Sequence, residues 1–110
     1  MKNEKILICG SIGYGGINEL KDFIKFLRSE NLNIIDYISE EDMDYTHIKD
    51  FRDKQSLSEK IINHDLQYID DADIIVILTN KPSFGTAMEQ MYAFNKKKKI
   101  ILYSEDPVPT

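Results

Sequence analysis

The sequence predicts an α/β fold built around a parallel sheet, on the strength of three observations. Apolar runs alternate along the chain with segments whose apolar residues recur at helical spacing. The run Ile74–Leu78 is purely aliphatic, which is typical of a strand buried on both faces. Loops that contain glycine or proline directly follow two of the apolar runs. Such alternation gives parallel strands with right-handed crossovers and helices on both faces of the sheet.

The chain has the size and composition of one globular domain, which we take to span residues 1–110. Its net charge of −5 argues against a nucleic-acid partner, because such binding depends on neutralising phosphates. No apolar run approaches the roughly 18 residues that a membrane span needs. Cys9 is the single cysteine and cannot form an internal disulfide, so we expect a cytoplasmic protein.

The first strand is predicted over Lys5–Cys9 and is followed at once by the loop Gly10–Gly16. Four glycines in seven residues allow positive φ angles and the close approach of a ligand to the backbone. A helix over Asn18–Ser29 follows, and this order of elements is found at phosphate and nucleotide sites. The spacing matches neither the dinucleotide nor the P-loop fingerprint. The loop is therefore either a binding loop or a flexible connection.

The middle of the chain predicts a second strand over Asn33–Tyr37 and a helix over Ser56–Asp70. Between them, the charged stretch 39–55 is predicted to be a lid or a variable loop. Ser56 and Ser58 are the candidate caps of the helix, because serine hydroxyls accept bonds from free N–H groups at a helix start.

Asp65 and Glu89 are the carboxylates that the pattern singles out. Asp65 lies near the apolar stripe of its helix, so it needs either a hydrogen-bond partner, such as a nearby loop backbone, or a function. After the aliphatic strand, Pro82 and Gly85 break the chain, and a helix over Ala87–Asn95 places Glu89 in about its first turn. There the helix dipole favours the ionised form, which is a candidate nucleophile or base. The alternative is an ordinary glutamate that complements the dipole.

The predicted sheet brings the candidate residues together. With the first strand central and a last strand over Ile100–Tyr103, the order is 2-1-3-4, in a Rossmann-like (flavodoxin-like) three-layer sandwich of four to five strands. The loop Gly10–Gly16, Ser83 and Glu89 then face one cleft. Ser83 or Thr86 caps the helix that carries Glu89. Four large side chains of that helix are interpreted as packing residues rather than as a cofactor site: Met88, Met91, Tyr92 and Phe94.

Three blocks of residues carry a family resemblance: Cys9–Ile12 (C-G-S-I), His64–Asp73 (H-D-L-Q-Y-I-D-D-A-D) and Pro82–Glu89 (P-S-x-G-x-x-x-E). Together they resemble the nucleoside 2-deoxyribosyltransferase superfamily. Within it they are most similar to the 2′-deoxynucleoside 5′-monophosphate N-glycosidases, which are hydrolases. The similarity runs from about residue 5 to about residue 103, which is nearly the whole chain.

The resemblance implies a role for each matching residue. Glu89 matches the nucleophile that attacks C1′ of the deoxyribose, and Asp65 matches the aspartate that interacts with the sugar and the departing base. Ser83 matches the serine with which the hydrolases hold the 5′-phosphate, whereas transferases place an aspartate there for the 5′-hydroxyl. The implied substrate-binding set also contains Gly10, Ser11, Ile12, Gly13, Tyr14 and Gly85.

The implied reaction is hydrolysis of the N-glycosidic bond of 2′-deoxynucleoside 5′-monophosphates, without a metal or an organic cofactor. The implied partners are a small nucleotide or nucleoside and a second copy in a homodimer, with Met88, Met91 and Tyr92 as contacts. Two positions depart from the hydrolases, because Leu7 replaces a tyrosine and Gly13 replaces an arginine. The alternatives are a transferase that exchanges bases between nucleosides and a nucleotide-binding module without turnover.

Overall fold

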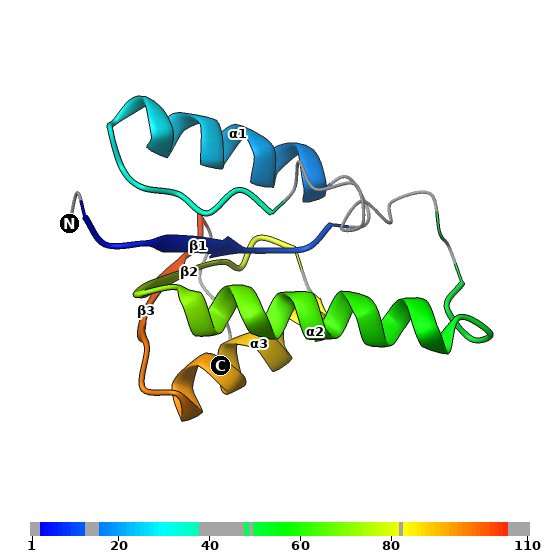
Figure 1. The fold of residues 1–110 in the computed structure, drawn as a ribbon. Coiled ribbons are helices and arrows are strands. Elements are labelled where there is room, and N and C mark those ends of the chain that lie inside the picture. Colours follow the sequence, from blue (N-terminus) through cyan, green and yellow to red (C-terminus); the bar gives the residue numbers. More distant parts are fainter. Residues whose placement is uncertain (1–2, 13–15, 38–47, 49, 82, 106–110) are drawn as a thin grey trace.

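A computed structural model of the chain describes residues 3–12, 16–37, 48, 50–81 and 83–105. Figure 1 shows a central sheet with one helix on one side and two helices on the other, which confirms the predicted α/β class. The elements in chain order are β1 (Ile6–Cys9), α1 (Gly16–Ser29), α2 (Gln55–Asp71), β2 (Ile74–Leu78), α3 (Phe84–Asn95) and β3 (Lys99–Tyr103).

The sheet is parallel and has the order β1-β2-β3. Ile6 of β1 lies opposite Ile74 of β2, which in turn lies opposite Lys99 of β3. The described residues therefore form three strands rather than the four to five predicted, and the order 2-1-3-4 is not confirmed. Among the described helices, none is long and apolar enough to cross a membrane.

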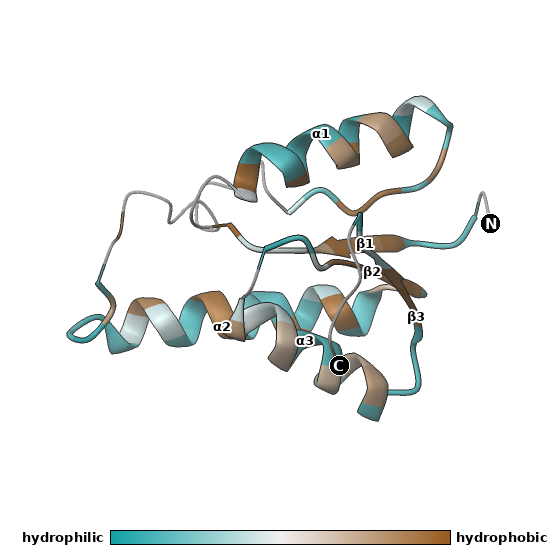
Figure 2. Cartoon of the chain, turned by 180° about the vertical axis from the view of Figure 1, so that it is seen from behind, coloured by the Kyte–Doolittle hydropathy of each residue, from teal (hydrophilic) through white to brown (hydrophobic). Residues whose placement is uncertain are grey.

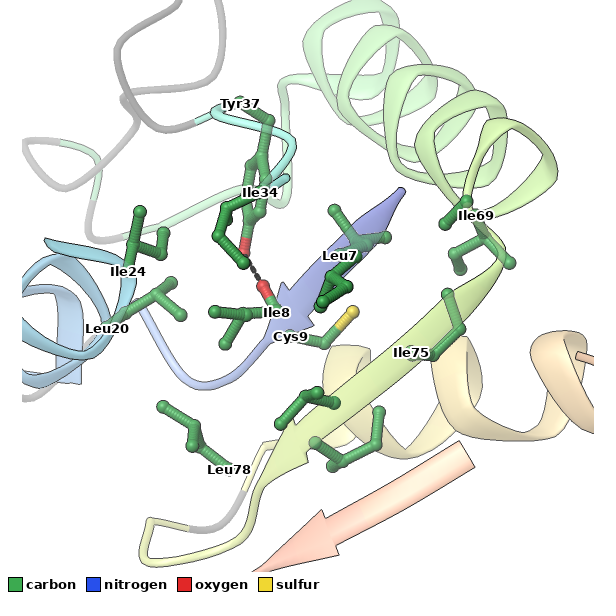
Figure 3. Close-up of a cluster of buried hydrophobic side chains, with 14 of the residues drawn as sticks. Leu7, Ile8, Cys9, Leu20, Ile24, Ile34, Tyr37, Ile69, Ile75 and Leu78 are labelled. Carbon is green, nitrogen blue, oxygen red and sulfur yellow. Dashed lines mark hydrogen bonds between the residues drawn. The ribbon is translucent and has the colours of Figure 1, made fainter. Parts of the chain in front are cut away.

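The predicted strand at 33–37 is reduced to a single bridge between Ile34 and Ile6. The Ile35 N–H donates a hydrogen bond to the Ile6 carbonyl at 2.8 Å. The next ladder bond would use the Ile8 carbonyl, but that oxygen accepts a 2.8 Å bond from the Tyr37 hydroxyl instead (Figure 3). A side chain thus takes the place that the backbone of a longer strand would occupy.

The core lies between the sheet and the helices. Every residue of β1 and β2 is buried, and Figure 2 shows apolar residues concentrated along the strands. Leu20 and Ile24 of α1 pack toward Ile8 on one face, and Ile69 of α2 packs toward Leu7 on the other (Figure 3). Burial of each such side chain stabilises the fold by roughly 1.5–3 kcal/mol.

Two helix starts differ in how well they were predicted. Ser83 caps α3, as one of the two predicted caps, and its Oγ accepts from Thr86 N–H at 3.2 Å. The predicted caps Ser56 and Ser58 are wrong for α2, because the helix begins at Gln55 and its N-cap is Lys54. Ser58 N–H already donates to the Lys54 carbonyl at 2.9 Å, so both serines lie inside the helix.

Met88, Met91 and Phe94, which were interpreted as packing residues, do not pack in the core of the protomer. Their exposed fractions are 69%, 60% and 68%. Helix α3 faces the sheet with the small residues Thr86 and Ala93, so the large side chains are left on its outer surface. Tyr92 is half-buried, and its hydroxyl donates to the Asp70 carboxylate at 2.9 Å.

The predicted lid at 39–55 lies largely outside the described residues. Within the described part, Asp50 and Arg52 form an exposed ion pair with an N–O distance of 2.6 Å. This pair lies just before Gln55, the first residue of α2.

Candidate active site

The candidate site lies at the carboxyl ends of β1 and β2. These strands are parallel neighbours, so the chain leaves both of them at the same edge of the sheet. Gly10 follows β1 directly and lies against Leu78, the last residue of β2, because a Cβ added at Gly10 would be 3.3 Å from the Leu78 Cβ. The predicted meeting of the loops after these two strands is therefore observed in their described residues.

Two carboxyl groups and a thiol form a cluster on the α2/α3 side of this edge. Asp65 belongs to α2, Glu89 to α3, and Cys9 is the last residue of β1. Burial raises the pKa of the Cys9 thiol well above its ordinary value, and the charges of Glu89 and Asp65 raise it further. The three groups thus lie within electrostatic reach of one another although they are far apart in the sequence.

Burial also dominates the ionisation of both carboxyl groups. It raises the pKa of Glu89 to about 8, and repulsion from the Asp65 charge acts in the same direction. Burial raises the pKa of Asp65 to about 6, while His64 acts in the opposite direction. Near neutral pH the pair therefore holds about one proton, mainly on Glu89, because the two pKa values lie on either side of 7.

The sequence predicts that Glu89 is ionised and lies at a helix start, and the structure contradicts this prediction. Helix α3 begins at Phe84 rather than near Ala87, so Glu89 lies in the second turn, and no acidic residue lies in the first. The dipole acts mainly within the first turn, so burial outweighs it at Glu89. An ordinary glutamate that only complements the dipole does not fit this position.

The polar groups of the cluster lack protein partners. Within the described part of the chain, neither Asp65 nor Glu89 forms a hydrogen bond or an ion pair, and the buried Nδ1 of His64 has no partner. The suggested bond from Asp65 to a loop backbone is thus not seen among these residues. Leaving a buried polar atom such as His64 Nδ1 unpaired costs about 1–3 kcal/mol, so the cluster is a candidate for a site that a ligand completes.

A second part of the site lies on the α1 side of the same edge. A cavity of about 10 Å³, the size of one water molecule, opens beside Ser11 and the end of β2. Gly16 allows α1 to start there, because a Cβ at this position would collide with the Ser11 carbonyl oxygen. The cavity is lined by Gly10, Ser11, Gly16, Glu19, Leu20, Leu78 and Lys81.

Lys81 is a residue of this region that the sequence reasoning missed. It is half-buried in the loop between β2 and α3, and it forms no ion pair with the described residues. Its position directly before the Pro82-Ser83 pair was the signal that could have pointed to it. The arrangement adds a positive charge beside Ser11 and the N-terminus of α3.

The other predicted site residues occupy different environments. Ser83 is half-buried at the N-cap of α3, and Gly85 is exposed in the first turn. Ile12 is a buried core residue, whereas Gly13 and Tyr14 lie outside the described residues. Leu7, which stands where a tyrosine was expected by resemblance, is buried with an exposed fraction of 2%.

A family model described as nucleoside 2-deoxyribosyltransferase matches residues 9–110. The matched span holds both carboxyl groups, the Gly10 loop and the Ser83 cap. The curated proteins give no match to the chain.

Proposed function

This chain belongs to the nucleoside 2-deoxyribosyltransferase family, and on this premise we propose that it hydrolyses the N-glycosidic bond of 2′-deoxynucleoside 5′-monophosphates. The products are a free base and deoxyribose 5-phosphate. One observation carries the proposal: Glu89 and Asp65 form a half-buried pair without partners in the described chain, at the sheet edge where α/β proteins bind ligands. A pair of this kind supplies the two carboxyl groups that retaining glycosidases use.

The protonation of the pair suits a two-step reaction. Ionised Glu89 attacks C1′ while the C1′–N bond breaks, and the bonding electrons leave with the base. The proton of the pair is carried by Asp65 in this step and passes to the departing base. Water then cleaves the Glu89 ester and returns its proton to the pair. The form with one proton predominates between the pKa values of about 6 and 8, and its proton lies mainly on Glu89. The reaction uses the less populated arrangement of this form, in which the proton has moved to Asp65 and Glu89 is ionised.

Three groups favour a phosphorylated substrate. The Ser83 hydroxyl accepts a bond from Thr86 N–H but retains its own proton, which it can donate to a phosphate oxygen. The N-terminus of α3 adds the positive end of a helix dipole. Lys81 supplies a positive charge nearby. It could take over the role of the family arginine, which is replaced by Gly13 in this sequence. A carboxylate at position 83 would instead repel a phosphate dianion.

The protein is further proposed to act as a homodimer. The described chain exposes Phe84, Met88, Met91 and Phe94 along α3, and apolar side chains gathered on one helix are typical of an interface. Tyr92, the third contact expected by resemblance, is half-buried against α2 through Asp70, so it belongs to the packing of the protomer.

The test is a product assay with deoxynucleotides and deoxynucleosides, in which free base and sugar phosphate are followed by chromatography. We expect base release from the 5′-monophosphates, with a bell-shaped dependence of kcat/KM on pH that has apparent pKa values near 6 and 8. Glu89→Gln removes the nucleophile and lowers kcat by at least about 10³-fold. Glu59→Gln makes the same chemical change at an exposed position of α2 and is the matched control.

Each other outcome supports a different reading. A new nucleoside formed in the presence of a second base identifies a transferase. Nucleotide binding that survives Glu89→Gln, with no base released by the wild type, identifies a binding module and contradicts the proposal.

A further inference from the structure

The side chain of Asn80 connects three segments at the edge of the sheet where the candidate site lies. Asn80 follows β2 in the loop that leads to Lys81 and Ser83. Its Nδ2 donates to the Glu19 carboxylate of α1 at 2.8 Å. Its Oδ1 accepts from Glu105 N–H, just after the end of β3, at 3.0 Å. Both ends of the amide are therefore used, which fixes the orientation of the side chain.

Glu19 brings a negative charge to the place where the phosphate of the proposed substrate is expected. It lies in the first turn of α1, where a carboxylate complements the helix dipole. It also lines the small cavity beside Ser11 that Lys81 lines, and Leu20 and Leu78, both labelled in Figure 3, line the same cavity. A carboxylate here repels a phosphate and attracts the Lys81 ammonium group, and both effects weaken phosphate binding.

Glu19 and Lys81 do not neutralise each other, although they line the same cavity. Neither of these two described side chains forms an ion pair. The Glu19 carboxylate is instead held by the Asn80 amide, in a bond that is half-buried. Such a bond is stronger than one between neutral groups, because a carboxylate is a charged acceptor. It leaves the charge of Lys81 available to a ligand.

We propose that Asn80 is a positioning residue of the phosphate subsite, because by holding the Glu19 carboxylate it keeps Lys81 free to bind the 5′-phosphate. The inference rests on the proposed function for its ligand, and it adds two residues that act on the affinity for that ligand. Asn80 also joins the loop that carries Lys81 and Ser83 to the start of α1. Glu19 thus sets how strongly the subsite prefers a phosphate to an uncharged 5′-hydroxyl.

The test is the affinity for deoxyribose 5-phosphate, which carries the phosphate but no base, measured by titration calorimetry. In Asn80→Leu the Glu19 carboxylate loses its donor and pairs with Lys81, so the Kd should rise by about fivefold. In Asn80→Leu/Glu19→Gln no charge is left to pair with Lys81, so the Kd should return to within about twofold of wild type. Asn63→Leu makes the same change at an exposed position of α2 and is the matched control.

Two further variants separate the effect of charge from an effect on folding. Glu19→Gln keeps an oxygen that accepts from Asn80 and removes the charge, so the Kd should fall by about twofold. When Asn80→Leu is added to Lys81→Met, the Kd should change little, because Glu19 then has no ammonium group to pair with. Circular dichroism spectra of all variants should match that of wild type.

Each outcome decides one claim. A Kd that rises in Asn80→Leu and stays high after Glu19→Gln is added shows that Asn80 only supports the fold, which overturns the inference and leaves the proposed function standing. Weaker binding in Glu19→Gln alone also overturns it, because the carboxylate is then a group that binds the ligand. If wild type does not bind deoxyribose 5-phosphate, the inference is overturned whatever the base-release assay shows. If the expected order of Kd values is found but no 5′-monophosphate releases its base, the inference stands and the proposed function falls.

Discussion

The carboxyl cluster beside β1 and the outer edge of β3 depart from the usual distribution of polar and apolar groups in opposite ways. At the first, Glu89 and Asp65 are half-buried ionisable groups without described partners. At the second, Ile101, Leu102 and Tyr103 are large apolar side chains left in water. Both arrangements are unfavourable in an isolated protomer. Partly buried charges lose hydration, and exposed apolar area orders the water at its surface.

The contrast teaches that the two regions await partners of different kinds. A buried polar cluster is completed by a small polar ligand that restores the lost hydrogen bonds. Exposed apolar side chains are covered by another apolar surface. The two regions can be tested separately by substitutions in each.

The largest effect is expected at Glu89, where activity and stability should change in opposite directions. The pKa of Glu89 is about 8 in the folded protein and has an ordinary value of 4.5, so the folded state binds this proton more tightly. The resulting stability is complete below pH 4.5 and is lost as pH rises through 8. Glu89→Gln should therefore be more stable than wild type by roughly 2–4 kcal/mol at pH 8.5, since one pKa unit is worth about 1.4 kcal/mol.

Urea unfolding at pH 4 and at pH 8.5 measures this difference. The two proteins should differ little at pH 4, where Glu89 is protonated in both the folded and the unfolded state. Loss of both activity and stability at pH 8.5 would show that Glu89 is a structural residue.

A smaller effect sharpens the comparison between the buried and the open strand. Ile75 of β2 is fully buried, so Ile75→Ala should lower the free energy of unfolding by about 3–4 kcal/mol. Leu102→Ala in β3 should cost at most about 1 kcal/mol in dilute protein. Denaturant curves at two protein concentrations provide the measurement. The cost of Leu102→Ala should grow with concentration if a second copy covers the strand, and a constant cost would argue that nothing does.

The smallest effect is expected at Lys81. Lys81→Met removes the positive charge near Ser11 and should raise KM for a 5′-monophosphate by about 5–10-fold, with kcat little changed. The corresponding 5′-hydroxyl nucleoside should show no such change, because it carries no phosphate. Lys54→Met, an exposed change at the start of α2, is the control. Equal effects on both substrates would mean that Lys81 acts through the fold.

Much of the fold could be predicted from the sequence because it depends on short-range patterns. The aliphatic run of β2, the apolar spacing of α1 and α2 and the serine that caps α3 are each set by residues a few positions apart. The placement of Asp65 near a buried face followed from the same helical spacing. The position of Asp65 was thus predictable, whereas Glu89 lies one turn further into its helix than predicted, and the chemical roles of both stay proposals.

The remaining features were decided by tertiary structure. The strand at 33–37 was cut short because the Tyr37 side chain takes the Ile8 carbonyl, a contact across 29 positions. The pKa of Glu89 is raised rather than lowered because burial by distant segments outweighs the helix dipole. Strands β2 and β3 are both rich in aliphatic residues, yet among the described strands β2 alone has a neighbour on both sides. Patterns along the chain determine which elements form, whereas burial and charge depend on the neighbours that folding brings to each residue.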